Sequence, residues 1–173
     1  MTLADLPGLP CPYCGRVTGA DAPWARSAVA LWGWCGVKLA VAGETAGVLL
    51  VGPMEDPAQA MLMSTWVIPA RVNTGLGRQL LQRTAAGLVE NRVRTVFAQG
   101  SRTNLRCSAP PRDYLRAVGF TRGLDERLWH LDLDRVVTER GGMREVFERL
   151  MGSLRPAPPE PAGGVISGRA LLG

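Results

Sequence analysis

The strongest constraint on the fold lies in residues 61–91, where an apolar run, a glycine-containing loop and an amphipathic pattern follow one another. Met61–Ile68 is apolar enough for a strand, and Pro69 ends it because proline cannot donate a hydrogen bond to a sheet. Apolar residues then recur at helical spacing over Leu76–Asn91. A strand, a short loop and a helix in this order are typical of a mixed α/β fold.

Other apolar runs predict the rest of the sheet. Val37–Ala42 and Ala46–Val51 are separated by residues 43–45, which predicts a β-hairpin with a three-residue loop. We expect further strands at Val93–Ala98 and Arg127–Leu133. The antiparallel hairpin therefore precedes a strand–helix–strand unit in one mixed sheet.

Three helices are expected besides the one that starts at Leu76. Trp24–Trp34 and Asp113–Val118 are short, and each stops near a glycine. Asp134–Leu154 carries a helical repeat that the pair Gly141-Gly142 divides into two pieces. This last helix is compatible with packing on its own sheet or on a second subunit, so a homodimer is an open alternative.

The length of 173 residues fits one domain. Residues 1–22 form an irregular, cysteine-containing N-terminal segment, residues 23–133 form the domain, and residues 134–154 form the C-terminal helix. Residues 155–173 are rich in proline and glycine and are expected to be a disordered tail.

Net charge and hydropathy limit the kinds of molecule that this protein is expected to bind. Twenty basic and fifteen acidic residues give a net charge of +5, which suits an anionic ligand as well as it suits nucleic acid. Few aromatic residues lie among the arginines of residues 92–127, which disfavours nucleic-acid stacking. No stretch reaches the roughly 20 apolar residues of a membrane helix, and no signal peptide precedes the domain. We therefore expect a cytoplasmic protein without a membrane partner.

The loop before Leu76 has the chemistry of a phosphate site. The first N–H groups of a helix lack partners within it and lie at the positive end of the helix dipole. Gly75 and Gly77 would let a phosphate approach the backbone, and Arg71 and Arg78 would add positive charge. The third glycine of a dinucleotide-binding motif is replaced by Leu80, and the loop lacks the Gly-Lys-Ser/Thr ending of a Walker motif. A purely structural turn is the alternative.

Two motifs carry a resemblance to a known family. Residues 67–78 resemble the acetyl-CoA motif of the GNAT acetyltransferase superfamily, and residues 113–120 resemble that family's Phe-Tyr-x-x-x-Gly-Phe signature. The resemblance covers roughly residues 24–133. The whole chain also resembles a group of actinobacterial GNAT-like proteins, which have a cysteine pair near the N-terminus and an extra C-terminal helix.

The resemblance implies an α/β (α+β) fold, with a mixed, mostly antiparallel sheet flanked by helices. It also implies an N-acetyltransferase that binds acetyl-CoA and transfers the acetyl group directly to an amine of a protein or small molecule. The pyrophosphate would lie on the loop, and the pantetheine arm would pair with the strand before it. The residues that this assigns to the cofactor are Thr65, Trp66, Val67, Ile68, Arg71, Val72, Gly75, Leu76, Gly77 and Arg78.

The catalytic residues depart from the family pattern. The tyrosine that protonates the thiolate in the family would fall at Leu115, whereas the tyrosine of this chain is Tyr114. Tyr114 is therefore the candidate acid, with a core packing role as the alternative. Met61–Ile68 contains no glutamate that could serve as the base. The other hypotheses are a non-catalytic acyl-CoA binding or regulatory module and an arginine-mediated protein or RNA adaptor.

The cysteines allow a metal site. Cys11 and Cys14 have zinc-knuckle spacing, and Cys35 and Cys107 could complete four thiolates around a structural zinc ion. Without a second Cys-x-x-Cys motif the alternatives are reduced free thiols or a redox-active pair.

Overall fold

The computed structural model describes residues 1–102 and 108–134. These residues belong to a compact unit, Met1–Val137, and a second unit comprises Thr138–Gly173. The helix expected to continue to Leu154 and the tail expected after it lie outside the described residues. Within the described residues no helix is long and apolar enough to cross a membrane.

A six-stranded sheet organises the described residues, with the strand order β1-β2-β3-β4-β6-β5. Its strands are β1 (Gly36–Val41), β2 (Glu44–Pro53), β3 (Gln59–Val67), β4 (Thr95–Gln99), β5 (Thr121–Arg122) and β6 (Leu128–Asp132). Only the central pair β3–β4 is parallel, and every other neighbouring pair is antiparallel. The expectation of a mixed, mostly antiparallel sheet is confirmed.

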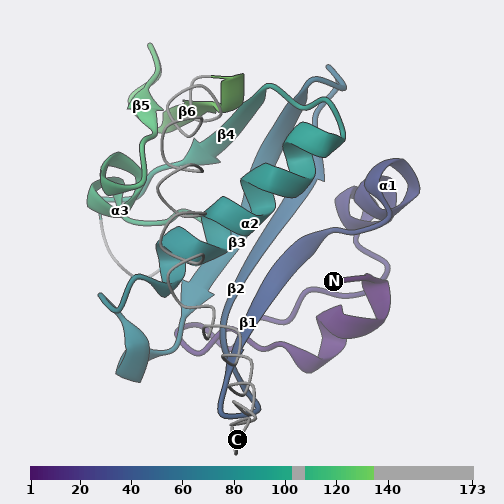
Figure 1. The fold of residues 1–173 in the computed structure, drawn as a ribbon, viewed down its shortest axis with the longest axis vertical. Helices are drawn as coiled ribbons and strands as arrows, with labels where there is room; N and C mark the ends of the chain where they lie inside the picture. Colours follow the sequence, from purple (N-terminus) through teal and green to yellow (C-terminus); the bar gives the residue numbers. More distant parts are fainter. Residues whose placement is uncertain (103–107, 135–173) are drawn as a thin grey trace, which may run out of the picture. The chain divides into compact units, whose positions relative to one another are not determined.

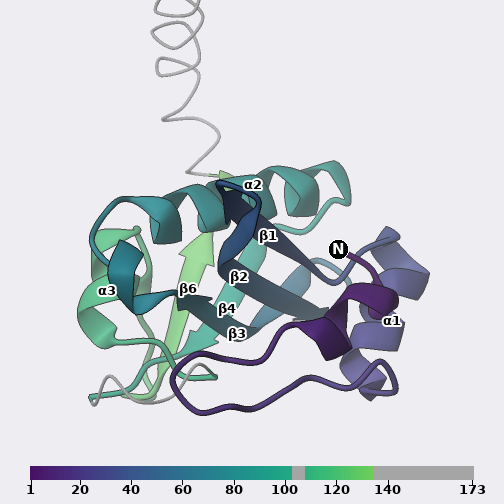
Figure 2. The ribbon, with the colours of Figure 1, turned by 90° about the horizontal axis from the view of Figure 1, so that it is seen from below.

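Helices cover both faces of this sheet. The helices are η1 (Leu3–Gly8, a 3-10 helix), α1 (Pro23–Trp32), η2 (Pro69–Arg71, a 3-10 turn), α2 (Leu76–Glu90) and α3 (Arg112–Ala117). Figure 1 shows α2 running along the sheet. In Figure 2, α2 and α3 lie on one face, whereas η1, α1 and the segment between them lie on the other.

Strand β2 separates two apolar cores. Leu49 and Val51 point to the α2 side, where they pack with residues of α2, α3 and β6. Val48 and Leu50 point to the other side, where they pack with η1 and α1. Because both faces of β2 are covered, its residues form an unbroken apolar run and not an alternating pattern.

The hairpin between β1 and β2 differs from its prediction. Val41 pairs directly with Glu44, so the loop has two residues, Ala42 and Gly43. Both have positive φ, 53° and 85°, as the two central residues of a type I′ turn require. The prediction of a three-residue loop was wrong because Glu44 and Thr45 belong to the strand. An alanine at a position of positive φ gave no sequence signal for this turn.

The N-terminal segment packs against the sheet. Leu6 is only 1% exposed and lies in the core on the α1 side. The Lys38 ammonium of β1 lies 2.7 Å from the Asp5 carboxylate of η1. This hydrogen bond and that from the Thr2 N–H hold the pKa of Asp5 at about 2, below its ordinary value of 3.8. The sequence predicted neither η1 nor β5, since each is too short to show a periodic pattern.

We expect Asp5→Asn to lower the free energy of unfolding by less than about 1 kcal/mol, because the ion pair is partly exposed. The folded-state pKa lies below the ordinary one, so the contribution is present above pH 3.8 and is lost as the pH falls toward 2. Urea unfolding at several pH values should show the wild type and the variant converging in acid. Glu55→Gln, at an exposed site without an ion pair among the described residues, is the control. A stability difference that does not change with pH would contradict this assignment.

Candidate functional site

The parallel strands β3 and β4 separate part-way along their length. They pair only at Gln59–Thr95, Ala60–Val96 and Met61–Phe97, although β3 continues to Val67. On the other side of β3, Leu50 of β2 lies opposite Ser64 and Val51 lies opposite Leu62. Met63 is therefore an extra residue, a β-bulge. Bulges bend a strand, and we infer that this one directs β3 away from β4.

A cavity of about 790 Å³ borders the part of β3 beyond this ladder, and no residue of β4 lines it. Its volume is within the size range of small-molecule sites. Its walls come from the end of β3, the loop after it, the first turn of α2, and α3 with the residues before it. Its lining comprises Tyr13, Thr65, Trp66, Val67, Arg71, Val72, Asn73, Gly75, Gly77, Arg78, Pro110, Pro111, Asp113, Tyr114, Ala117 and Val118. We call this cavity the β3–β4 cleft.

The loop between β3 and α2 shapes one end of the β3–β4 cleft. Gly75 precedes the first residue of α2 with φ of 86°, a conformation that glycine adopts without strain. No atom lies within 4 Å of the place where its Cβ would be. No side chain caps this end of α2, so the N–H groups of its first turn have no side-chain partner. The result is an open, positively polarised helix end that faces the cleft.

Gly77 lines the cleft as the sequence suggested, and it also packs against α3. A Cβ at Gly77 would lie 2.8 Å from the ring of Tyr114. The Tyr114 hydroxyl donates a hydrogen bond to the Gly77 carbonyl at 2.9 Å. Gly77 thus lets α3 pack closely on the start of α2, whereas Gly75 supplies the open approach to the backbone.

Tyr114, and not position 115, faces the β3–β4 cleft. Leu115 is fully buried in the core on the α2 side, together with Phe120. Burial raises the pKa of Tyr114 to about 12, and a hydrogen bond with Thr65 partly offsets this rise. The one-residue offset from the family signature therefore leaves a protonated tyrosine on the cleft wall.

Positive charge predominates in the lining. Arg71 lies on η2, and Arg78 lies on the first turn of α2, where its guanidinium donates to the Ala117 carbonyl at 3.1 Å. Asp113 is the one acidic residue of the lining, and it pairs with Arg116 at 3.2 Å. An anionic ligand therefore meets two arginines and little opposing charge.

The structure does not bring every predicted cofactor residue to the cleft. Ile68 packs with the core on the α1 side, and Leu76 packs with the core on the α2 side. One contact was missed: Tyr13, from the turn between Cys11 and Cys14, donates a hydrogen bond to the Val67 carbonyl at 2.6 Å. The sequence carried no signal for this contact, since 54 residues separate the two partners.

The cysteines give no support to the predicted zinc site. Cys11 and Cys35 are buried in the core on the α1 side, and Cys14 is exposed. Cys107 lies outside the described residues. In residues 1–102 and 108–134, no group of three or more His, Cys, Asp or Glu side chains could hold a metal ion. Burial raises the pKa of the Cys35 thiol, which suits a packing role.

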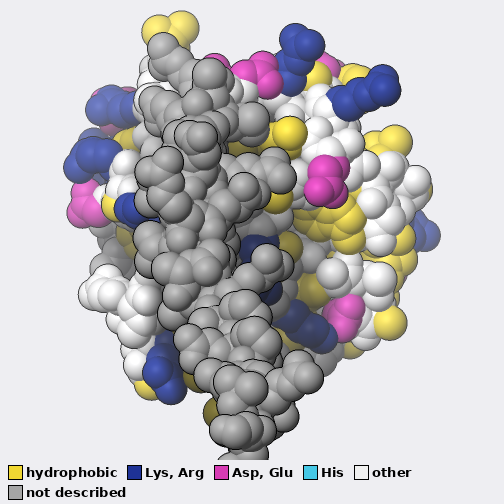
Figure 3. Space-filling view, viewed as in Figure 1, with side chains coloured by type: hydrophobic (Ala, Val, Ile, Leu, Met, Phe, Trp, Pro, Cys, Tyr) yellow, Lys and Arg dark blue, Asp and Glu magenta, His cyan; other side chains and the backbone are white. Residues whose placement is uncertain are grey.

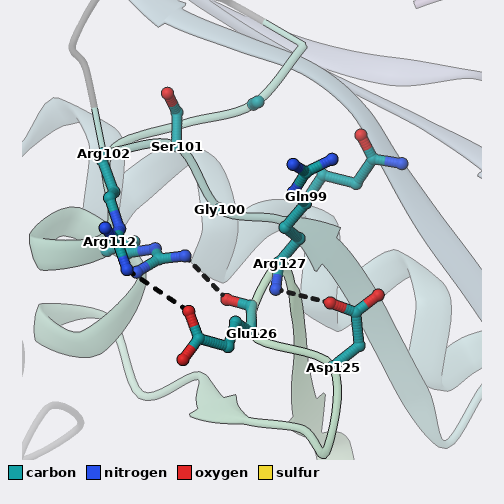
Figure 4. A pocket seen from close by; sticks show the side chains of 9 residues that line it. Gln99, Gly100, Ser101, Arg102, Arg112, Asp125, Glu126 and Arg127 are labelled. Atoms are coloured by element: carbon teal, nitrogen blue, oxygen red, sulfur yellow. Dashed lines mark hydrogen bonds and ion pairs between the residues drawn. The ribbon is translucent and has the colours of Figure 1, made fainter.

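A second polar cavity, of about 690 Å³, lies between the end of β4 and the turn before β6 (Figure 4). Arg102 pairs with the Glu126 carboxylate at 3.3 Å, and Arg112 donates to the Glu126 carbonyl at 2.9 Å. Since two of the three arginines that line this cavity already contact Glu126, it is a weaker candidate for an anionic ligand than the β3–β4 cleft.

We expect Gly77→Ala to destabilise the fold, because the added methyl group would push on the Tyr114 ring. Such overpacking costs about 1–3 kcal/mol, whereas alanine gains at most about 1 kcal/mol over glycine in a helix. Urea unfolding measures the net change. Gly8→Ala is the control, since nothing lies within 4 Å of its added Cβ. A Gly77→Ala protein as stable as the wild type would show that the ring is not tightly packed.

No protein-family model matches the sequence, and no curated protein matches it significantly. Solved structures do match the fold. YncA of Salmonella typhimurium, assigned as an acetyltransferase and solved with its cofactor acetyl-CoA, has a TM-score of 0.55 at 19% identity, covering 77% of this chain and 91% of its own. Ard1 of Thermoplasma volcanium has a TM-score of 0.54 at 12% identity, covering 75% and 90%.

A third structure is an assigned GNAT-family acetyltransferase of Desulfovibrio desulfuricans. It has a TM-score of 0.49 at 25% identity, covering 57% of this chain and 68% of its own. At these identities the likeness of YncA and Ard1 establishes the fold, and it agrees with the α+β fold expected from the sequence.

Proposed function

We propose that this chain is a GNAT-type N-acetyltransferase that binds acetyl-CoA in the β3–β4 cleft and transfers the acetyl group to an amine. The observation that carries the proposal is the separation of β3 from β4 beside the open N-terminus of α2. YncA, which shares the fold, was solved with acetyl-CoA. The identity of the acceptor, the formation of a homodimer and a cytoplasmic location are predictions that no observation here tests.

The two ends of the β3–β4 cleft suit the two parts of the cofactor. The N–H groups at the start of α2 would hold the pyrophosphate, with charge supplied by Arg71 and Arg78. Open space at Gly75 meets the need for close approach to the backbone. The edge of β3 over Thr65–Val67, which has no ladder with β4, would hydrogen-bond the pantetheine amides as an added strand does.

Acetyl transfer replaces the thioester C–S bond with a C–N bond, so the leaving thiolate needs a proton and the attacking amine loses one. Tyr114 can donate a proton to the thiolate, because its raised pKa keeps it protonated at neutral pH and its side chain lines the cleft. To do so, the hydroxyl must turn from the Gly77 carbonyl to the sulfur atom. Its role is that of a proton donor positioned on α3.

No general base stands out in the cleft. Asp113 is exposed and already paired with Arg116, and no histidine belongs to the lining. We infer that the acceptor amine loses its proton to water, so an amine of lower pKa should react faster at neutral pH. A chain that binds acetyl-CoA without turning over any amine would instead be the non-catalytic module.

The adaptor hypothesis has less support. On the face shown in Figure 3, the visible Lys and Arg side chains are scattered and mixed with Asp and Glu. A nucleic-acid interface usually gathers its basic residues into one patch or stripe. The alternative predicts salt-sensitive partner binding that does not depend on acetyl-CoA.

Calorimetric titration with acetyl-CoA tests the site directly. We expect micromolar affinity, about −8 kcal/mol, and a loss of about tenfold in Arg71→Glu because the charge beside the phosphates is reversed. Arg83→Glu makes the same charge change on an exposed site of α2 outside the cleft and should bind as the wild type does. If the folded wild type does not bind, or if both variants lose affinity equally, the proposed cofactor site is wrong.

Tyr114→Phe tests the proton donor. We expect kcat to fall by about 100-fold, the lower end for general acid catalysis, with little change in acetyl-CoA affinity. Tyr13→Phe is a matched control, because Tyr13 also lines the cleft and is the only other tyrosine of the chain. Release of free CoA measures turnover, and urea unfolding checks that both variants fold. An unchanged kcat in Tyr114→Phe, or an equal loss in Tyr13→Phe, would contradict the assignment.

A further inference from the structure

A third cavity borders β3 on the α1 side of the sheet, across the strand from the β3–β4 cleft. It measures about 320 Å³ and lies between the N-terminal segment, α1, β2 and β3. We call it the N-terminal cavity. Trp66 lines both the N-terminal cavity and the β3–β4 cleft. The two cavities therefore meet at Trp66, which is where an acceptor amine would have to reach the thioester.

We propose that the N-terminal cavity holds the acceptor, and that the acceptor is a small primary amine carrying an apolar group and one carboxylate, such as an apolar amino acid. This inference rests on the proposed acetyltransferase function and deepens it by naming the substrate class. Three features of the cavity support this proposal: the bulge of β3 beside it, its one apolar and aromatic wall, and its charge.

The bulge at Met63 serves both sides of β3. Side chains of a regular strand alternate between faces, but Met63 and Ser64 both line the N-terminal cavity. The bulge therefore places two consecutive side chains on this cavity, just beyond the point where pairing with β4 ends. A ligand here would lie against the part of β3 that borders the cleft.

One wall of the N-terminal cavity is apolar and aromatic, whereas Arg16, Thr18, Ser64 and Ser108 contribute polar groups to the rest. Trp24 of α1 and Trp66 of β3 both contribute to the apolar wall, beside Val48 and Leu50 of β2. Trp24 packs closely on β2, since a Cβ at Gly52 would lie 3.2 Å from the Trp24 Cβ. Flat, largely buried indole groups favour an apolar or aromatic ligand group. The volume is near the lower end for ligand sites and suits a molecule of amino-acid size.

The charge of the N-terminal cavity favours a ligand that carries a negatively charged group. Arg16 is the one Lys, Arg, Asp or Glu in the lining, and it has no ion pair among the described residues. A polycationic amine would meet repulsion without a carboxylate to balance it, whereas a ligand carboxylate would pair with Arg16.

The test is release of CoA from acetyl-CoA with phenylalanine, phenylalaninamide and spermidine as acceptors, for the wild type and Arg16→Gln. Because the three amines differ in their own pKa, the diagnostic quantity is the ratio of kcat/KM for phenylalanine over phenylalaninamide. We expect Arg16→Gln to lower this ratio about tenfold, mainly by raising KM for phenylalanine, and spermidine to be the poorest acceptor. Arg26→Gln, on the exposed surface of α1 outside the cavity, should leave the ratio unchanged.

The outcomes separate this inference from the proposed function. If acetyl-CoA binds but spermidine is the best acceptor, or if Arg16→Gln leaves the ratio unchanged, the acceptor class is wrong and the cofactor site stands. If acetyl-CoA does not bind to the folded wild type, the proposed function fails and the acceptor class fails with it. Titration of Arg16→Gln with acetyl-CoA should give the wild-type affinity, which shows that the substitution acts on the acceptor alone.

Discussion

The bulge at Met63 is the constraint on which the arrangement of the candidate site depends. A parallel pair in the middle of a sheet normally satisfies the backbone groups of both strands along their shared length. Here the ladder stops after Met61, and β3 continues for six residues to Val67 beside a strand with which it no longer pairs. Backbone N–H and C=O groups without a partner are costly in a protein interior. An edge of this kind, in the centre of a sheet, is a place where an extended ligand can hydrogen-bond the backbone, beside the Val67 carbonyl that already accepts from Tyr13.

The two cores explain how this opening is tolerated. On the α2 side, Leu49, Leu62, Leu80 and Leu88 are almost fully buried and hold the helix against the sheet. On the other side, Leu6 and Val48 are buried to a similar degree. Since each face of the sheet is anchored by its own core, the gap between β3 and β4 does not have to be closed by further strand pairing. One ligand-sized cavity borders β3 on the α2 side and another borders it on the α1 side, and Trp66 lines both.

Some elements of the fold could be predicted from the sequence, and others could not. The helical stripe that begins at Leu76 was predictable because burial of one face imposes a helical period. The apolar run of β2 was predictable because both of its faces are buried. The Ala42-Gly43 turn was not predictable, since alanine rarely adopts positive φ. The bulge at Met63 was not predictable either, because Met63 looks like any other apolar residue of its strand. It becomes visible only through the register with β2.

The candidate site shows the same division. Gly75, Arg71 and Arg78 were predicted from the loop motif, and all three line the β3–β4 cleft. Which of the neighbouring positions 114 and 115 faces the cleft depended on how α3 rests on the core, and the sequence pattern of six helical residues cannot fix that rotation. The position of Tyr13 at the cleft depends on a contact between segments that are far apart in the chain, and a single sequence holds no signal for such a contact.

The hydrogen bond from Tyr13 to Val67 has a thermodynamic consequence. Tyr13 contacts the rim of the β3–β4 cleft, and Arg16, three residues later in the same segment, lines the N-terminal cavity. The Cys11 N–H donates to the Arg16 carbonyl at 2.9 Å, so a backbone hydrogen bond closes the turn that carries Tyr13. Any ligand that shifts this turn from one side changes the wall that the other ligand contacts. The two binding equilibria are then linked, and each ligand alters the affinity for the other by the same factor.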